Sequence, residues 1–541
     1  MRKDCRMEKF EILDCTLRDG GYCNQWKFGK NNILKITEAL CESKIDIIEC
    51  GFLTEKEVYE SEKTKYNTVE QIQQILPINR EGSMFVCMIN YGEYDVHKLP
   101  IYDGTSVEGI RVAFHKKDMD AAINMCSDIK KKGYKVFVQP MVSLSYTDEE
   151  FLALIQQVNL LQPYAFYIVD SFGVMKRKDL MRLFYLVEHA LLQGIKIGYH
   201  SHNNMQLSYS NAQALVDIRT KRDVIIDASV YGMGRGAGNL NTELFVEYLN
   251  DNIGTEYELK PILNIIDSIL NRFYQENYWG YSLPNYLSAK HNIHPNYANY
   301  LCEKNTLTVE NIDEIFSLME ENKKVIFDKA YIEELYWKYM ENGNVQEEHM
   351  CDLKKFLKGK EILLIAPGKS CVIEKEIITK QAQKENVVTI SVNFAYEKVV
   401  PQFIFVSNLR RFRELDDGDK AKCIVTSNIP AGQIYLQTNY RELLNTEDGV
   451  RDNAGLMAVK FLMNYEVAGI WLAGFDGYSH DVEENYGDDK MALATQNARL
   501  DVMNYGITKI MQEYAKDITI RFLTAPKHII CLLYTSPSPR D

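Results

Sequence analysis

Short apolar runs recur along the first half of the chain, and turn residues bound each of them. The runs are rich in β-branched and aromatic residues, a composition that favours strands. Eight such runs precede residue 254, namely Phe10–Cys15, Ile45–Phe52, Met84–Asn90, Gly109–Phe114, Lys135–Met141, Ala165–Phe172, Lys196–His202 and Ile225–Gly232. The pattern therefore predicts eight strands in this region.

Amphipathic stretches with helical spacing lie between most of these runs. The clearest are Asn31–Ser43, Lys116–Lys132, Asp148–Gln162, Lys176–Leu192 and Met205–Arg219, whereas Tyr91–Glu108 has the weakest helical pattern. Strands that alternate with helices pair in parallel, and eight such units predict a closed (β/α)8 barrel of the α/β class, a TIM barrel. A doubly wound open sheet is the alternative, but it accounts less well for polar residues at so many strand ends.

The rest of the chain divides into segments of different character. We expect the barrel to occupy residues 1–255, a helical extension rich in Tyr, Asn and Trp to follow at 256–345, and a second α/β unit at 346–530. Residues 531–541 resemble a translated sequencing adapter fused to the reading frame, so we expect the natural C-terminus to be missing and exclude this segment from the fold.

Composition narrows the possible partners and the compartment. The formal net charge of −13 argues against nucleic acid or an anionic membrane surface as a partner. No stretch is long and apolar enough to span a bilayer. The 12 cysteines show no pairing rhythm. We therefore expect a cytoplasmic protein with reduced thiols.

Polar residues at two predicted strand ends suit a metal site. His200 and His202 lie two residues apart on one strand, so their side chains point the same way. Asp19 follows the first strand and can supply a carboxylate if the two ends converge. Two imidazoles and a carboxylate with open positions suit a divalent ion, and Arg18 is placed to stabilise a developing enolate oxygen.

Three motifs resemble the HMG-CoA lyase-like family of metal-dependent barrels, which includes 4-hydroxy-2-oxovalerate aldolase, HMG-CoA lyase and isopropylmalate synthase. Residues 16–20 (TLRDG) are similar to the family's signature after the first strand, and residues 200–203 (HSHN) to its metal-binding motif. Residues 236–239 (GAGN) are similar to its glycine-rich loop after the last strand. The resemblance spans residues 10–254, and residues 169–175 (VDSFGVM) favour the oxovalerate aldolase branch.

This resemblance implies roles for individual residues. It implies that the metal ligands are Asp19, His200 and His202, and that Asn239 is a further ligand or a neighbour of the ligands. It also implies that Arg18 stabilises the enolate. The expected cofactor is a divalent metal, Mn²⁺ or Mg²⁺. The expected substrates are a small 2-oxo acid and an aldehyde, and we expect a homo-oligomer.

One position departs from the family's pattern. In the aldolase branch a histidine base follows shortly after the Arg-Asp-Gly motif, but Tyr22 stands here. A tyrosine with a reference pKa of about 10 is a poor base near pH 7. Either the donor substrate differs from that of the aldolase branch, or another residue of the chain supplies the base. The candidates for that base are His115, His291 and His294.

The catalytic candidates are therefore Arg18, Tyr22, Asp170 and His294, and two of them have an equally simple structural interpretation. Asp170 is as consistent with bracing the barrel mouth as with contact to metal or substrate. His294 precedes Pro295, which is typical of a helix cap.

The motifs predict a carbon–carbon lyase, a metal-dependent aldolase acting next to a 2-oxo acid. Two alternatives stay open. One is an acyl-CoA-dependent Claisen-type synthase on the same barrel. The other is a non-catalytic barrel that serves as a scaffold.

The second unit reads as a Rossmann-like sheet. Its predicted strands are Glu361–Ala366, Val387–Val392, Phe403–Ser407, Cys423–Ser427, Gly469–Ala473 and Ile518–Thr524, with helices at Asn453–Tyr465 and Met491–Tyr514. Residues 363–370 indicate a strand that enters a Gly-containing turn, and such a turn can present backbone N–H groups to an anion.

Several segments of this unit resemble Rossmann-like domains related to bacterial sialyltransferases and to the pterin-pyrophosphokinase-like group. The resemblance implies a nucleotide or nucleotide sugar as ligand, in a pocket lined by Gly368, Ser370, Asn393, Asn408 and Asp476. A structural or oligomerising domain without a ligand is the alternative.

Overall fold

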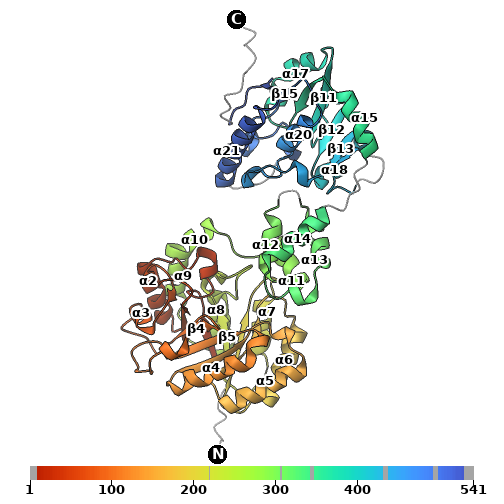
Figure 1. The fold of residues 1–541 in the computed structure, drawn as a ribbon. Helices are drawn as coiled ribbons and strands as arrows, with labels where there is room; N and C mark the ends of the chain where they lie inside the picture. Colours follow the sequence, from red (N-terminus) through yellow and green to blue (C-terminus); the bar gives the residue numbers. More distant parts are fainter. Residues whose placement is uncertain are drawn as a thin grey trace, which may run out of the picture. The chain divides into compact units, whose positions relative to one another are not determined.

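The computed structural model describes residues 9–218, 220–304, 307–340, 347–430, 436–491 and 497–528. The chain forms two compact units (Figure 1). One comprises Met1–Asn299 and Glu320–Phe327, and the other comprises Tyr300–Met319 and Asp328–Asp541. The adapter-like segment 531–541 lies outside the described residues.

The first unit is built on a closed barrel of parallel strands. The eight barrel strands are β1 (Phe10–Asp14), β2 (Ile47–Leu53), β4 (Met84–Asn90), β5 (Gly109–Phe114), β6 (Lys135–Pro140), β7 (Ala165–Asp170), β8 (Lys196–Ser201) and β9 (Val224–Ala228). Strand β1 pairs with both β9 and β2, which closes the barrel. The predicted (β/α)8 barrel is confirmed.

Helices surround the barrel (Figure 1). Five coincide with the predicted stretches, namely α2 (Lys30–Glu42), α4 (Met119–Lys131), α5 (Asp148–Leu161), α6 (Arg177–Ala190) and α7 (Ser208–Val216), and α8 (Thr242–Ile253) is an additional helix after the last strand. The weakly patterned connection Tyr91–Glu108 contains only a short 3₁₀ helix at Val96–Lys98. The connection from β2 to β4 carries α3 (Val69–Gln73) and the two-residue β3 (Lys65–Tyr66), which is too short to leave a periodic signal.

The segment after the barrel is helical. Its helices are α9 (Leu259–Ile265), α10 (Asn271–Glu276), α11 (Leu283–Lys290), α12 (Pro295–Cys302), α13 (Val309–Ser317) and α14 (Lys329–Met340). Helices α9 to α11 belong to the barrel unit, whereas α13 and α14 belong to the second unit.

The second unit holds a parallel sheet of seven strands. Their order is β14 (Leu436–Thr438), β13 (Cys423–Thr426), β12 (Phe403–Val406), β11 (Val387–Val392), β10 (Glu361–Ile365), β15 (Gly469–Ala473) and β16 (Ile520–Phe522). The order reverses beside β10, because β11 pairs with one edge of this strand and β15 with the other. The α/β prediction is confirmed, and six of the seven strands coincide with predicted runs.

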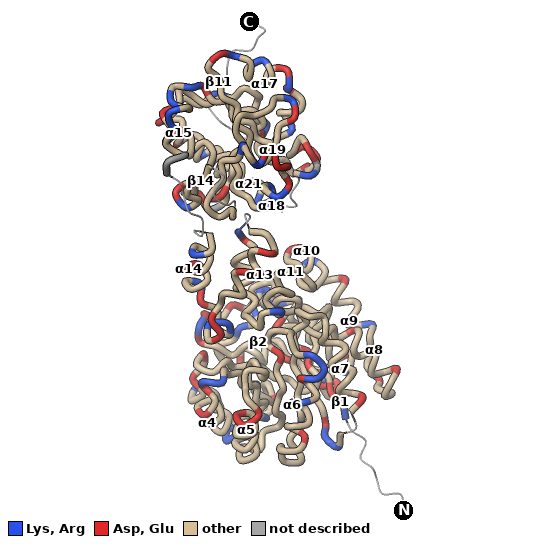
Figure 2. Tube along the Cα trace, turned by 90° about the vertical axis from the view of Figure 1, so that its right-hand side faces the viewer, with Lys and Arg blue, Asp and Glu red and all other residues tan. Residues whose placement is uncertain are grey.

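Helices accompany this sheet and complete the second unit. They are α15 (Glu347–Leu357), α16 (Ser370–Ile373), α17 (Lys375–Ala382), α18 (Leu409–Glu414), α19 (Asp417–Lys420), α20 (Ala454–Met463) and α21 (Asn497–Tyr514). Helix α4 carries both acidic and basic residues, whereas α5 begins with three acidic residues and contains no Lys or Arg (Figure 2). Among the described residues, no helix combines the length and the apolar character needed to cross a membrane.

The barrel interior combines close packing with a buried charge. Tyr167 on β7 fills space that Gly198 on β8 leaves open, since a Cβ on Gly198 would lie 2.3 Å from the Tyr167 ring. The Arg111 guanidinium lies 4.9 Å from the centre of the same ring. Arg111 is fully buried, so it needs ionic partners inside the barrel.

Arg222, in the loop before β9, ties that loop to the C-terminal end of α6. Its Nη1 donates to the carbonyl oxygens of Leu192 and Ile195 at 2.7 and 3.2 Å. Its Nη2 donates to Leu191 O and Glu188 O. One buried guanidinium thus satisfies carbonyl groups that the end of a helix leaves without partners.

Arg222→Met is expected to destabilise the barrel by about 2–4 kcal/mol, because it leaves several buried carbonyl groups without donors. The exposed neighbour provides the control, and Lys221→Met is expected to change stability by less than about 0.5 kcal/mol. Urea unfolding followed by circular dichroism measures both. Equal effects of the two substitutions would contradict this role of Arg222.

Candidate metal centre and active site

Asp19, His200 and His202 converge at the mouth of the barrel. Asp19 follows β1, His200 lies on β8, and His202 lies just beyond the end of β8. All three are buried, and each offers a ligand atom within 4.8 Å of the others. The convergence predicted from the two strand ends is confirmed, and the group could hold a metal ion.

A carboxylate behind His200 orients its ring. The Nδ1 atom of His200 lies 2.9 Å from Oδ2 of Asp227, a residue of β9. This contact occupies Nδ1 and leaves Nε2 to bind an ion, an arrangement common in protein metal sites. The sequence interpretation missed Asp227, although a carboxylate inside an apolar strand is a usable signal.

His202 is in the chemical state that a metal requires. Burial lowers its pKa to about 3 against the opposing pull of Asp19, so the imidazole is neutral at pH 7. Its Nδ1 has no hydrogen-bond partner among the described residues and lies 3.7 Å from Asp19 Oδ2. A buried nitrogen without a partner beside a carboxylate fits a site that could bind a cation.

Asp19 remains ionised despite its burial. Burial alone would raise its pKa, but the Arg18 guanidinium and the two imidazoles hold the pKa well below its usual range. Nδ2 of Asn239 donates to Asp19 Oδ2 at 2.7 Å, and Oδ1 of Asn239 has no partner in the described part of the chain. Asn239 therefore lies beside the Asp19 carboxylate, and its role as a metal ligand stays a prediction.

Arg18 connects the metal-capable group to a buried network of charges. Its Nη1 donates to Asp19 Oδ1 at 2.5 Å, and its Nε donates to Glu49 Oε2 at 2.9 Å. Glu49 also accepts from Arg111, and Arg111 pairs with Asp227. The third nitrogen, Nη2 of Arg18, is buried and has no partner among the described residues. It is a donor available to an oxyanion at this site.

Tyr22 lies on the short helix α1 (Gly21–Asn24) at the rim of the mouth. Its ring packs edge-on against Trp26 and lies under the Arg235 guanidinium, which is 5.5 Å from the ring centre. Desolvation raises the pKa of Tyr22 against the opposing effect of Arg235. The phenol therefore keeps its proton at neutral pH.

Asp170 holds the loop after β7. Its two carboxylate oxygens accept from the backbone N–H groups of Val174 and Met175 at 3.0 and 2.9 Å. Burial raises its pKa to about 6 despite these bonds. These contacts describe a brace at the barrel mouth, and contact with substrate stays a prediction.

His294 reaches the same mouth from the segment before α12. Its ring lies 6.0 Å from that of Phe172, which follows β7, and its Nδ1 accepts from the Asn296 backbone N–H. Burial lowers its pKa to about 3, with further contributions from Arg235 and His115. His294 thus combines a capping bond with a place near the candidate site.

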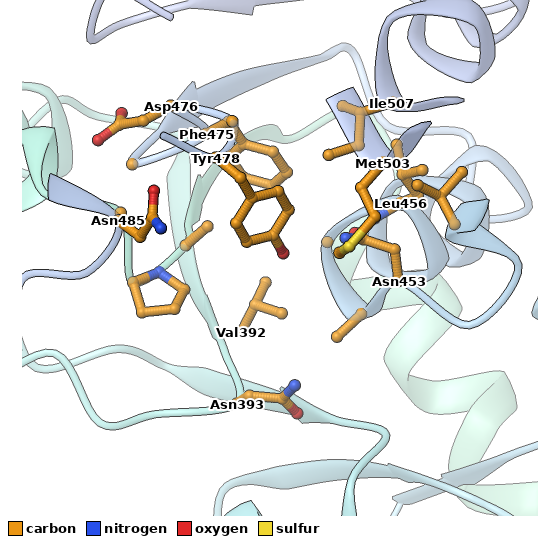
Figure 3. A pocket seen from close by; sticks show the side chains of 18 of the residues that line it. Val392, Asn393, Asn453, Leu456, Phe475, Asp476, Tyr478, Asn485, Met503 and Ile507 are labelled. Atoms are coloured by element: carbon orange, nitrogen blue, oxygen red, sulfur yellow. The ribbon is translucent and has the colours of Figure 1, made fainter. Parts of the chain in front are cut away.

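The second unit contains a cavity of about 210 Å³ beyond the carboxyl ends of its strands. Gly368, Asn393, Asn408 and Asp476 line it, as predicted, and follow β10, β11, β12 and β15. Leu456, Met503 and Ile507 form an apolar wall opposite Asp476 and Asn485 (Figure 3).

Ser370, the fifth predicted lining residue, has a different role. Its backbone N–H donates to Asp476 Oδ2 at 2.7 Å, and its hydroxyl donates to Asp476 Oδ1. The protein's own carboxylate therefore occupies the turn that we expected to bind an anion.

Comparison with known proteins agrees with the barrel's motifs. Residues 9–269 match the family profile described as HMGL-like. A 4-hydroxy-2-oxovalerate aldolase of Geobacillus genomosp. 3 is 26% identical over 49% of this chain and 77% of its own length. The enzyme of the same description from Pseudoalteromonas translucida is 27% identical over 46% of this chain and 71% of its own length.

Among solved structures, the N-terminal domain of a candidate aldolase from Bacteroides vulgatus is 28% identical. The alignment covers 54% of this chain and 96% of that domain, with a TM-score of 0.46.

We expect His200→Ala and His202→Ala to lose bound Mn²⁺, because each removes one of three converging ligands. His97→Ala, at an exposed histidine of the same unit, is the matched control and is expected to keep full occupancy. Metal content after dialysis, with circular dichroism to confirm folding, measures the effect. Full occupancy in a folded His200→Ala protein would disprove the site.

Proposed function

Because residues 9–269 match the HMGL-like family profile, we propose that this protein is a cytoplasmic, divalent-metal-dependent aldolase that makes or breaks a carbon–carbon bond next to a 2-oxo acid. The observation that carries the proposal is the pairing of Arg18 with Asp19. One guanidinium both holds the carboxylate of the metal-capable group and keeps a buried nitrogen available beside it. This is the donor that an enolate oxygen needs.

Asp19, His200 and His202 would hold Mn²⁺ or Mg²⁺, which supplies Lewis-acid polarisation of the 2-oxo acid's oxygens. The Arg18 guanidinium would donate to the oxygen on which negative charge develops. In the direction of synthesis, a methyl C–H bond of the 2-oxo acid breaks and its proton moves to a base. The new carbon–carbon bond forms to the aldehyde carbon, and the aldehyde oxygen takes up a proton.

Protonation states assign different tasks to Tyr22 and His294. Tyr22 keeps its proton at neutral pH, so we assign it the delivery of a proton to the aldehyde oxygen in synthesis. His294 is neutral at pH 7, the state of a proton acceptor, although a pKa of about 3 makes it a weak one. We therefore propose His294 as the base and His115 as the next candidate.

Arg18→Ala is expected to lower aldol turnover and pyruvate methyl-proton exchange by about 10²–10³-fold, because it removes the oxyanion donor. Bound metal should remain, since the three ligands are intact. Arg272→Ala, at an exposed arginine of the same unit, is expected to leave both rates unchanged. NMR of pyruvate in heavy water with Mn²⁺ follows the exchange, and a panel of aldehydes tests turnover.

The same assays separate the two alternatives. Wild-type protein that binds metal but shows neither exchange nor turnover would support a scaffold. Release of free thiol from acetyl-CoA, without aldol turnover, would support a Claisen-type synthase.

A second binding function is favoured by the cavity of the second unit. It lies where the strand order reverses between β10 and β15, the place where open parallel sheets bind ligands outside their carboxyl ends. Amide side chains on one part of its wall and apolar side chains on another suit the ribose and base of a nucleotide. We therefore propose a nucleotide or nucleotide sugar as its ligand.

Met503→Trp is expected to weaken nucleotide binding by about tenfold or more, because the larger side chain occupies the cavity. Tyr505→Trp changes an exposed position of the same helix and is the control. Calorimetric titration with nucleoside monophosphates and UDP-sugars measures the affinities. If none of these compounds binds the wild-type protein, the second unit is a structural or oligomerising domain.

A further inference from the structure

Arg235 lies in the glycine-rich loop after β9, beside the metal-capable group. A Cβ on its neighbour Gly234 would lie 2.8 Å from Asp19 Oδ2, so the loop passes directly over this carboxylate. The Asn203 N–H donates to Gly238 O, and Asn204 Oδ1 accepts from the Ala237 N–H, both at 2.8 Å. Arg235 therefore projects from a loop that is tied to the strand end bearing His202.

The guanidinium of Arg235 is held in place but lacks a carboxylate. Its Nη2 donates to Ser171 O at 2.9 Å, and its guanidinium carbon lies 5.5 Å from the centre of the Tyr22 ring. Its Nε is buried and has no hydrogen-bond partner among the described residues. Within the described part of the chain, no carboxylate oxygen lies within 4.0 Å of its nitrogens.

The buried arginines of the barrel have acidic partners. Arg18 pairs with Asp19 and Glu49, Arg111 with Glu49 and Asp227, and Arg222 with Glu188. A partly buried guanidinium that contacts no carboxylate has little ionic compensation for its desolvation. An anionic group on a substrate would supply the partner.

Groups around Arg235 come from several different loops. Its charge acts on Asp19 and Tyr22 after β1, on His115 after β5, on His202 after β8 and on His294 before α12. The three histidines have lowered pKa values, and Tyr22 is a phenol that keeps its proton. Asp19 is the one anion among these five groups, and it is not in contact with Arg235 because its oxygens already accept from Arg18 and Asn239.

We propose that Arg235 forms an anion subsite that binds a carboxylate or phosphate group of the acceptor aldehyde. This inference rests on the proposed aldol chemistry and names the class of its second substrate. In the proposed function, Arg18 and an ion held by the metal-capable group bind the oxygens of the 2-oxo acid. Arg235 lies further along the loop, over Tyr22 at the partly exposed rim, where a second substrate would enter.

The test compares anionic with neutral acceptors in the full-length, Mn²⁺-loaded protein. Pyruvate is paired with succinic semialdehyde against butanal, and with glyceraldehyde 3-phosphate against glyceraldehyde. For wild type we expect kcat/KM to favour the anionic member of at least one pair by about 10- to 100-fold, the strength of a charge-assisted contact. A preference for succinic semialdehyde would indicate that the subsite binds a carboxylate, and a preference for glyceraldehyde 3-phosphate would indicate a phosphate.

Arg235→Met is expected to bring this ratio close to one, and Arg235→Lys to leave it in between, because lysine keeps the charge but not the planar fork. Arg272→Met, at an exposed site, should leave the wild-type ratio unchanged. If Arg235 had a purely structural role, its substitution would lower kcat/KM equally for the anionic and the neutral aldehyde of a pair. That result would overturn the proposal. So would a wild-type ratio near one in both pairs.

A binding measurement keeps this inference separate from the proposed activity. Calorimetric titration with succinate and with glycerol 3-phosphate needs no turnover. Arg235→Met is expected to lower the affinity for whichever compound the wild-type protein binds more tightly by about tenfold or more. Wild-type protein without pyruvate proton exchange would refute the aldolase assignment. Intact exchange with no Arg235-dependent binding or selectivity would refute only the subsite.

Discussion

A buried chain of alternating charges links the two sides of the candidate metal centre. It runs from Asp19 through Arg18, Glu49 and Arg111 to Asp227, which in turn holds His200. Three carboxylates face two guanidinium groups, so the chain carries one excess negative charge beside the two imidazoles. A divalent cation at Asp19, His200 and His202 would compensate that charge where hydration cannot.

The barrel creates this network because parallel strands deliver their carboxyl ends to one rim. Glu49, Arg111 and Asp227 belong to β2, β5 and β9, which are far apart in sequence. Each is buried and would be costly alone, so the ionic pairs also constrain how these strands align. The desolvation of a buried charge is most complete for Arg111, since its side chain is inaccessible to solvent and contacts Tyr167 in the barrel interior.

Both units place polar groups at the carboxyl ends of their strands, but the partners of these groups differ. At the barrel mouth, buried polar atoms of Arg18, His202, Asn239 and Arg235 have no partner within the described residues, which suits a site that could bind a cation and a polar ligand. In the second unit, Asp476 satisfies the turn at Ser370, and the cavity opens beside it. The anion-binding turn of the second sheet is thus closed from within, whereas the barrel rim keeps its donors available.

Local periodicity was enough to predict the eight barrel strands and the pairing of Asp19 with His200 and His202, because strand alternation and strand ends are properties of short segments. It missed β3, which has only two residues, and it missed Asp227 and Arg235. Their importance depends on partners from other strands: Asp227 matters because it meets His200 and Arg111, and Arg235 because it lies over Tyr22. The same holds for Ser370, whose N–H is occupied by a carboxylate 106 residues away. The sequence by itself determined which groups are present at each strand end, and only the tertiary structure decided which of them are satisfied and which remain open to a ligand.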